Sequence, residues 1–155
     1  MSKPVNTIEF WRERLKAEHL PDSVYVTNGS DWRFIDSSHE KILSPYVDKK
    51  VLDAGCGYGR WASFFRDYTG IDFSPDFIDK AKELHRDKTF IQADLNKLPF
   101  KDKEFDMAFC VSVKVMIVNN LGEEVWKPME EELKRVAKKV ILLEYTNPQD
   151  YEEIN

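Results

Sequence analysis

Cysteine and long apolar runs are scarce in this chain of 155 residues. The two cysteines, Cys56 and Cys110, lie in apolar or glycine-rich surroundings that indicate neither a disulfide framework nor a zinc site. No apolar run approaches the roughly 20 residues of a membrane span. The N-terminus, MSKPVNTIEFWRER, has no apolar segment typical of a secretory signal. We therefore expect a cytoplasmic protein with no membrane anchor and no bound metal.

Positive charge is also in the minority. The 23 basic residues are outnumbered by 28 acidic ones, and the net charge is −5. A general nucleic-acid binder needs a basic face, because binding releases counterions from the phosphates, so nucleic acid is not favoured as a partner. Short basic runs at 49–50, 134–135 and 138–139 are more typical of solvated ends of helices and strands.

The chain does contain enough apolar sequence for one globular domain, since 42% of its residues are hydrophobic and 33% are charged. Residues 1–48 show helical spacing and no strand alternation, and we expect them to form a helical lid. Residues 49–146 alternate short apolar runs with amphipathic segments, and 147–155 form a short tail. The sequence therefore predicts a single domain over residues 1–155, built on a cofactor-binding core at 49–146.

Five apolar runs in the core predict β-strands: KKVLDAG, TGIDF, TFIQAD, DMAFCVSV and VILLEYT. Helices are expected at RWASFFR, at SPDFIDKAKELHRD with Ser74 as N-cap and Phe77, Ala81 and Leu84 on its buried face, and from Pro128 in PMEEELKRVAKK. Continuous apolar strands separated by helices indicate a parallel sheet buried on both faces. We predict a doubly wound α/β fold with a mainly parallel, five-stranded sheet in the order 3-2-1-4-5 and helices on both faces.

Ligands of such folds bind beyond the carboxyl ends of the strands, where the first strand is followed by a glycine-rich turn. VLDAGCGYGR places Asp53 before three alternating glycines, Gly55, Gly57 and Gly59. Glycine tolerates positive φ and leaves no Cβ between the backbone and a ligand. With a helix expected next, backbone N–H groups would point toward the site. A turn without a ligand would need one such glycine, so three favour a binding loop.

Acidic and apolar residues also follow the later strands. Asp72 ends the second strand, where a carboxylate can accept both hydroxyls of a ribose, although it could instead serve the N-terminus of the next helix. Phe73 could pack on a flat base or in the core. Asp94 and Leu95 follow the third strand and could meet the edge of a base, although a loop-capping aspartate is the common alternative. Cys110, Val111 and Ser112, at the end of the fourth strand, would close the far side of the pocket.

Two kinds of ligand compete for the glycine loop. A dinucleotide fingerprint, G-x-G-x-x-G or a final Ala, fails at Arg60 when it starts from Gly55, and from Gly57 it lies too far from the strand. The pattern D-x-G-x-G-x-G instead begins with an acid. Asp53 would repel a pyrophosphate and attract a ligand with a positively charged amino group. An NAD-binding dehydrogenase is therefore the remote alternative.

The combined motifs over about residues 36–146 resemble the class I S-adenosylmethionine-dependent methyltransferases. VLDAGCGYGR is similar to the family's first motif, GIDFSPDFIDKAKE to its ribose-binding segment, and IQADLNKLPFKDKEFDMAFC to its adenine-binding loop and fourth strand. The resemblance implies a Rossmann-like fold, S-adenosyl-L-methionine as cofactor and S-adenosyl-L-homocysteine as product. It assigns the methionine part to Asp53 and to the loop backbone of Gly55, Cys56, Gly57 and Gly59, the ribose to Asp72, adenine to Phe73, Asp94 and Leu95, and the mouth of methyl transfer to Val111.

The chain also departs from that family. Family members often carry His-His after the fourth strand, where Val115 and Met116 stand here, and no motif for a nucleic-acid base as acceptor is present. The family's sheet ends in a two-strand hairpin, for which residues 147–155 leave little room. Strand five would then be an open apolar edge. We expect a second copy of the chain to cover that edge, which would make a homodimer.

No residue is identified as catalytic from the sequence. The side chains placed near the predicted mouth are those of His39, Lys114, Glu144 and Tyr145. Structural service is the more common role of each, and methyl transfer needs a base only for acceptors that must lose a proton. Trp32 and Arg33, in the lid, are predicted to contact the cofactor, with Arg33 pairing with its carboxylate.

The sequence predicts methyl transfer to an unidentified acceptor, either a small molecule or a protein. Because no acceptor motif is readable, a non-catalytic subunit that binds S-adenosylmethionine is the alternative. Both hypotheses require cofactor binding, and only the enzyme transfers the methyl group.

Overall fold

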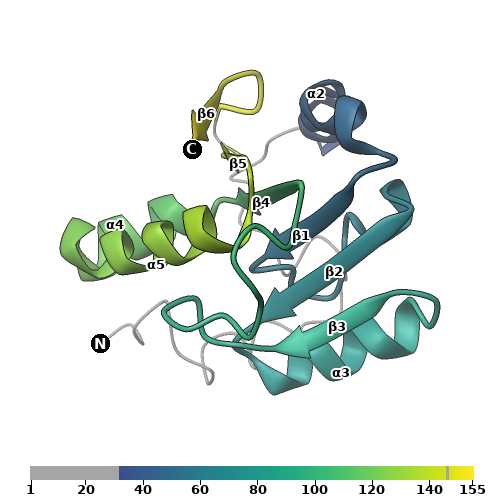
Figure 1. Ribbon diagram of the computed structural model, residues 1–155. Coiled ribbons are helices and arrows are strands. Elements are labelled where there is room, and N and C mark those ends of the chain that lie inside the picture. The colour runs from purple at the N-terminus through teal and green to yellow at the C-terminus, as the bar shows by residue number, and fades with distance from the viewer. Residues whose placement is uncertain (1–31, 146) are drawn as a thin grey trace, which may run out of the picture.

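A single mixed sheet organises the chain in a computed structural model that describes residues 32–145 and 147–155, without the side chains of 32–36 (Figure 1). The strands lie in the order β3-β2-β1-β4-β5-β6. All neighbours pair in parallel except β5 and β6. The predicted order 3-2-1-4-5 is confirmed, and a sixth strand is added to it. The strands are β1 Lys50–Ala54, β2 Asp67–Asp72, β3 Thr89–Gln92, β4 Met107–Val111, β5 Val140–Leu143 and β6 Tyr151–Ile154.

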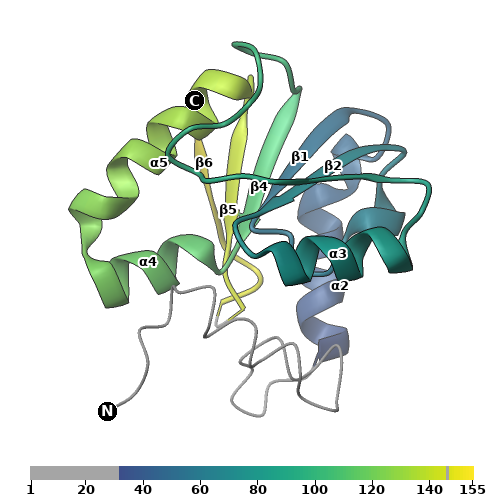
Figure 2. The same ribbon diagram turned by 90° about the horizontal axis from the view of Figure 1, so that it is seen from below.

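Helices cover both faces of the sheet, as predicted (Figure 2). Successive strand residues point to opposite faces. Ala108 and Cys110 of β4 therefore pack in the cluster that includes α4 and α5, while Met107 and Phe109 pack in the cluster that includes α2 and α3. The helical elements are α2 Trp32–Leu43, η1 Ser44–Tyr46, η2 Ala62–Phe64, α3 Pro75–Leu84, α4 Val113–Leu121 and α5 Glu123–Val136.

The start of α3 follows the sequence signals closely. The Ser74 hydroxyl accepts a hydrogen bond from the Phe77 N–H at 3.4 Å, and Pro75 opens the helix. Phe77 and Ala81 are buried as predicted, whereas Leu84 is 49% exposed. The prediction for Leu84 was wrong because the helix ends at this residue, where the apolar face no longer meets the sheet.

Two other helix predictions need correction. The segment 60–66 forms turns and the short 3-10 helix η2 in place of an α-helix. Helix α5 begins at Glu123, so Pro128 lies inside it and does not open it. The preceding helix α4 was not predicted; only its first residue, Val113, falls in the predicted fourth strand.

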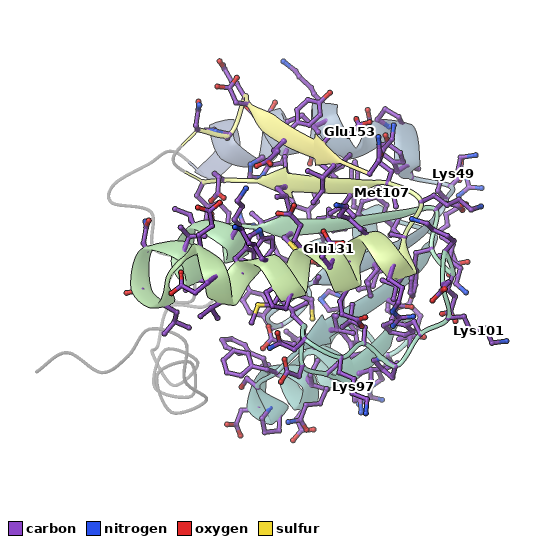
Figure 3. All side chains as sticks on the ribbon, turned by 60° about the vertical axis from the view of Figure 1, so that its left-hand side comes forward. Lys49, Lys97, Lys101, Met107, Glu131 and Glu153 are labelled. Carbon is purple, nitrogen blue, oxygen red and sulfur yellow. The ribbon has the colours of Figure 1, made fainter. Side chains whose placement is uncertain are left out.

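The largest correction concerns the tail. Residues 151–154 form β6, which runs antiparallel to β5 with Leu143 opposite Tyr151 and Val140 opposite Ile154. Glu153 on β6, labelled in Figure 3, pairs with Lys139 at 3.1 Å. Strand five is therefore not an open edge, and the reason first given for a homodimer is wrong. In the described part of the chain the free edge beyond β5 belongs to β6.

Candidate cofactor site

The parallel strands bring the predicted site residues to one edge of the sheet. Ala54 of β1 lies beside Ile71 of β2, and Asp72 lies beside Gln92 of β3. On the other side, the end of β4 at Val111 lies beside Leu143 of β5. Carboxyl ends of parallel strands meet at the same edge, which is where ligands of doubly wound folds bind.

The glycine loop is tied to the end of β2. The N–H groups of Gly55 and Cys56 both donate to the carbonyl of Ile71, at 2.8 and 2.9 Å. Gly55, Gly57 and Gly59 have φ of +81°, +56° and +89°, a region that side chains disfavour. The predicted backbone freedom is therefore required at all three positions.

Packing explains two of these glycines without a ligand. A Cβ on Gly55 would lie 2.5 Å from the Val113 side chain at the start of α4, and one on Gly59 would lie 2.9 Å from the rings of His85 and Phe90. No α-helix follows the loop in the described chain, since only η2 is formed there. The expectation of a helix N-terminus pointing at the ligand was therefore wrong.

Asp72 is held in place by backbone donors. Its Oδ2 accepts from the Gly57 N–H and its Oδ1 from the Ser74 N–H, both at 3.0 Å. The side chain is buried, and burial raises its pKa to about 6 against the lowering effect of these amides. Asp72 thus serves the start of the next helix and also joins the glycine loop to β2. Each of its oxygens keeps a second lone pair for a ligand hydroxyl.

Asp53 is the second buried acid of the site. Its Oδ2 accepts from the Tyr68 hydroxyl at 2.6 Å. Burial raises the pKa of Asp53 to about 7, the Tyr68 bond lowers it, and the nearby charge of Asp72 raises it further. Two acids in mutual electrostatic range favour a ligand that carries positive charge. The sequence analysis missed Tyr68, which lies inside the second strand and carried no motif.

The third strand contributes a more exposed turn. The Asp94 Oδ1 accepts from the backbone N–H and the side-chain amide of Asn96, at 2.9 and 3.0 Å. This is the loop-capping arrangement that was the alternative for Asp94. Leu95 is partly buried against the core cluster of α4 and α5, and Phe73 is half-buried. The contact of these residues with a base stays a prediction.

Ser112 closes the site after Val111, which is half-buried. Ser112 has φ of +58°, which is unusual for a residue other than glycine. Its N–H donates to the Leu143 carbonyl at 2.7 Å, and its hydroxyl oxygen accepts from the Tyr145 N–H at 2.9 Å. These bonds join the ends of β4 and β5 and hold the strained residue at the edge.

The other side chains predicted to lie near the mouth of the site are found around Ser112 and the end of β5. His39 of α2 is buried, with Nε2 3.2 Å from the Glu144 carbonyl oxygen, and Tyr145 is largely buried beside it. Lys114 pairs with Glu152 of β6 at 2.8 Å. Trp32 and Arg33 begin α2, but their side chains lie outside the described residues.

Two further features bear on what this part of the chain could bind. A cavity of about 280 Å³ lies between α2 and η2, beyond the glycine loop. It is lined by Glu40, Arg60, Trp61, Ser63 and Phe64. Among the described residues, no group of three His, Cys, Asp or Glu side chains could hold a metal ion, and no helix is long and apolar enough to cross a membrane.

Comparison with known proteins adds independent information. Residues 51–139 match the family described as methyltransferase domain. A fatty-acid O-methyltransferase of Mycolicibacterium smegmatis is 42% identical over 66 residues, which cover 37% of this chain and 24% of that protein. The chain spans between about a quarter and half of the length of the curated relatives it matches.

Two solved structures from archaea are similar. A Pyrococcus horikoshii OT3 protein has a TM-score of 0.66 and 27% identity, and the match covers 88% of this chain and 65% of that one. A Methanosarcina mazei structure described as SAM-dependent methyltransferase has a TM-score of 0.57 and 25% identity, over 65% of this chain and 55% of that one. With the glycine loop, both acids and the strand order in place over the matched residues, the chain belongs to the methyltransferase domain family.

Proposed function

We propose that this chain binds S-adenosylmethionine at the carboxyl edge of the sheet and transfers its methyl group to an acceptor. The observation that carries the proposal is the pair of buried acids, Asp53 and Asp72, held beside the glycine loop in a methyltransferase domain. The cofactor has an ammonium, a sulfonium and a ribose diol. These groups supply positive charge near the two buried carboxyls and hydrogen-bond donors for their remaining lone pairs.

The residues fit this cofactor better than a dinucleotide. Asp72 is oriented by the Gly57 and Ser74 amides and has lone pairs left for two ribose hydroxyls. Asp53 and the backbone at 55–57 would hold the methionine part. A pyrophosphate at the same place would meet both acids, and like charges raise the free energy of the complex. Adenine contacts by Phe73, Asp94 and Leu95, and cofactor contacts by Gly59, Trp32 and Arg33, remain part of the proposal.

The chain would catalyse methyl transfer mainly by positioning the acceptor against the cofactor. When bound, S-adenosylmethionine supplies a methyl group on a positively charged sulfur that becomes a neutral thioether. Val111 and Ser112 at the mouth would orient an acceptor lone pair in line with that methyl at about 3–3.5 Å. Water exclusion would come from the buried loop and from the lid proposed at residues 1–48, of which 1–31 lie outside the described residues.

Location and assembly belong to the same proposal. Both cysteines are free and buried, which suits a reducing cytoplasm. A single domain over 1–155 and a homodimer remain hypotheses, and the dimer would now form through the β6 edge. Light scattering at micromolar concentration tests the dimer, and a monomer there contradicts it.

Calorimetry with S-adenosylhomocysteine and with NAD tests cofactor choice. We expect S-adenosylhomocysteine to bind and NAD to give no heat; the opposite result would favour the dehydrogenase. Transfer of tritium from methyl-labelled S-adenosylmethionine to small molecules and proteins then separates an enzyme from a binding subunit. The acceptor is proposed to be a small molecule or a protein, and the panel includes oxygen acceptors beside amines because some relatives are O-methyltransferases.

A further inference from the structure

The Glu144 carboxylate has no role in the proposed cofactor site and lies directly beside that site. Glu144 is the first residue after β5, and Ser112 is the first after β4, in neighbouring strands. Burial raises the pKa of the Glu144 carboxyl, and the Ser112 hydroxyl and the Val115 backbone lower it by hydrogen bonding. The Oε2 atom of Glu144 is buried and has no hydrogen-bond partner among the described residues. A buried acceptor in this state calls for a donor from outside.

Two residues, Ser112 and Val113, lie between Glu144 and the glycine loop. Val113 fills the space in front of Gly55, since a Cβ there would lie 2.5 Å from its Cγ2. Val113 follows Ser112, which touches Glu144. Burial raises the pKa of the Cys110 thiol in β4, and the charges of Asp53 and Glu144 raise it further. Glu144 therefore lies at the same edge of the sheet as Asp53, at the end where β4 and β5 finish.

Among the residues that the structure describes, no cation is dedicated to Glu144. Lys114 of α4 lies within electrostatic range of Glu144, but its Nζ already bonds Glu152 of β6 at 2.8 Å. From α2, His39 reaches the Glu144 carbonyl through Nε2 at 3.2 Å. Burial is the main cause that raises the pKa of Glu144, and the charge of Glu152 adds to it. A positively charged donor is the missing partner.

We propose that Glu144 binds the methyl acceptor and that this acceptor is an amine. The inference rests on the proposed function. An ammonium supplies both a donor for Oε2 and the opposite charge. A carboxylate acceptor would add one more negative charge to a region that already holds Glu144, Asp53 and Asp72, and a hydroxyl would leave the Glu144 charge uncompensated.

The proton balance of this step is simple. Glu144 takes one proton from the ammonium, which frees the nitrogen lone pair. That lone pair forms the new N–C bond while the S–C bond breaks and its electrons stay on sulfur. The proton on Glu144 then passes to solvent as the methylated ammonium leaves.

Matched probes test this acceptor class by binding. The protein is saturated with S-adenosylhomocysteine and titrated by calorimetry with butylamine, butanol and butyrate, which differ mainly in the polar group. We expect butylamine to bind most tightly and its affinity to fall about tenfold or more in Glu144→Gln, because a charge-assisted hydrogen bond is lost. Glu153→Gln, an equal change on β6 (Figure 3), should leave it unchanged.

A second measurement on the wild type covers the case in which Glu144→Gln does not fold. Butylamine affinity should fall on acidification as Glu144 protonates, while butylamine itself stays charged. The proposal is overturned if butyrate or butanol binds better, if Glu144→Gln keeps full butylamine affinity, or if S-adenosylhomocysteine binds and butylamine does not. Failure to bind S-adenosylhomocysteine at all would instead sink the proposed function.

Discussion

The bond between Tyr68 and Asp53 makes a prediction that does not need a ligand. Tyr68→Phe removes one hydroxyl and keeps a ring that stacks on Phe65 at 6.3 Å and meets Phe90 edge-on at 5.7 Å. Asp53 then loses the donor that sits 2.6 Å from its Oδ2 in a buried place. The change therefore removes the hydrogen bond to a titrating carboxyl, together with the interaction of the same hydroxyl with the Cys56 thiol.

The expected effect depends on pH. With a folded pKa of about 7 against 3.8, Asp53 binds its proton more tightly in the folded chain. Its contribution to stability is complete below about pH 4 and is lost as the pH rises through about 7. At pH 5 the lost bond is a neutral one, worth about 0.5–1.5 kcal/mol, and at pH 8 it is a bond to a carboxylate, worth about 1.5–3 kcal/mol.

Urea unfolding of the ligand-free protein at pH 5 and pH 8 measures both values. Tyr151→Phe is the matched control, since Tyr151 is 51% exposed on β6, and we expect its effect to stay within about 0.5 kcal/mol. Equal losses for Tyr68→Phe at the two pH values would refute the reasoning, because Asp53 would then not titrate between them.

Three further changes test the site and the sheet. Asp72→Asn should weaken S-adenosylhomocysteine binding by about tenfold or more in calorimetry; unchanged affinity would count against the ribose assignment. Gly55→Ala should cost about 1–3 kcal/mol in urea unfolding, because φ is +81° and its Cβ would lie 2.5 Å from Val113; a stable variant would mean that the loop is not packed as described. Deleting 147–155 should expose the apolar edge of β5 and cause aggregation that light scattering detects; a soluble, monodisperse deletion variant would contradict this role for β6.

The sheet was largely predictable because its strands carry their own signal. Apolar runs such as VILLEYT are buried on both faces, and a parallel sheet is the structure that requires this. The N-cap at Ser74 was equally readable, since a hydroxyl before Pro75 satisfies a free N–H of the first turn. The apolar strands and the Ser74 N-cap were predictable because each depends on residues adjacent in the sequence.

The misses share one cause, which is dependence on distant partners. Tyr151–Ile154 has two acids in a row and no alternation, and it is a strand because β5 offers its edge and Lys139 pairs with Glu153. Residues 60–66 look helical, yet they form only turns and η2 in the connection from β1 to β2.

The sequence by itself determined the family pattern, the strand order expected of it and the acids at the strand ends, because each is a local motif in a known register. Only the tertiary structure decided what those acids touch. Asp72 meets Gly57 and Asp53 meets Tyr68, each pair 15 residues apart, and Glu144 lies beside Ser112 of the neighbouring strand end. Burial and hydrogen-bond partners, which decide the pKa and the ligand preference of each carboxyl, arise only when the sheet brings its strand ends together.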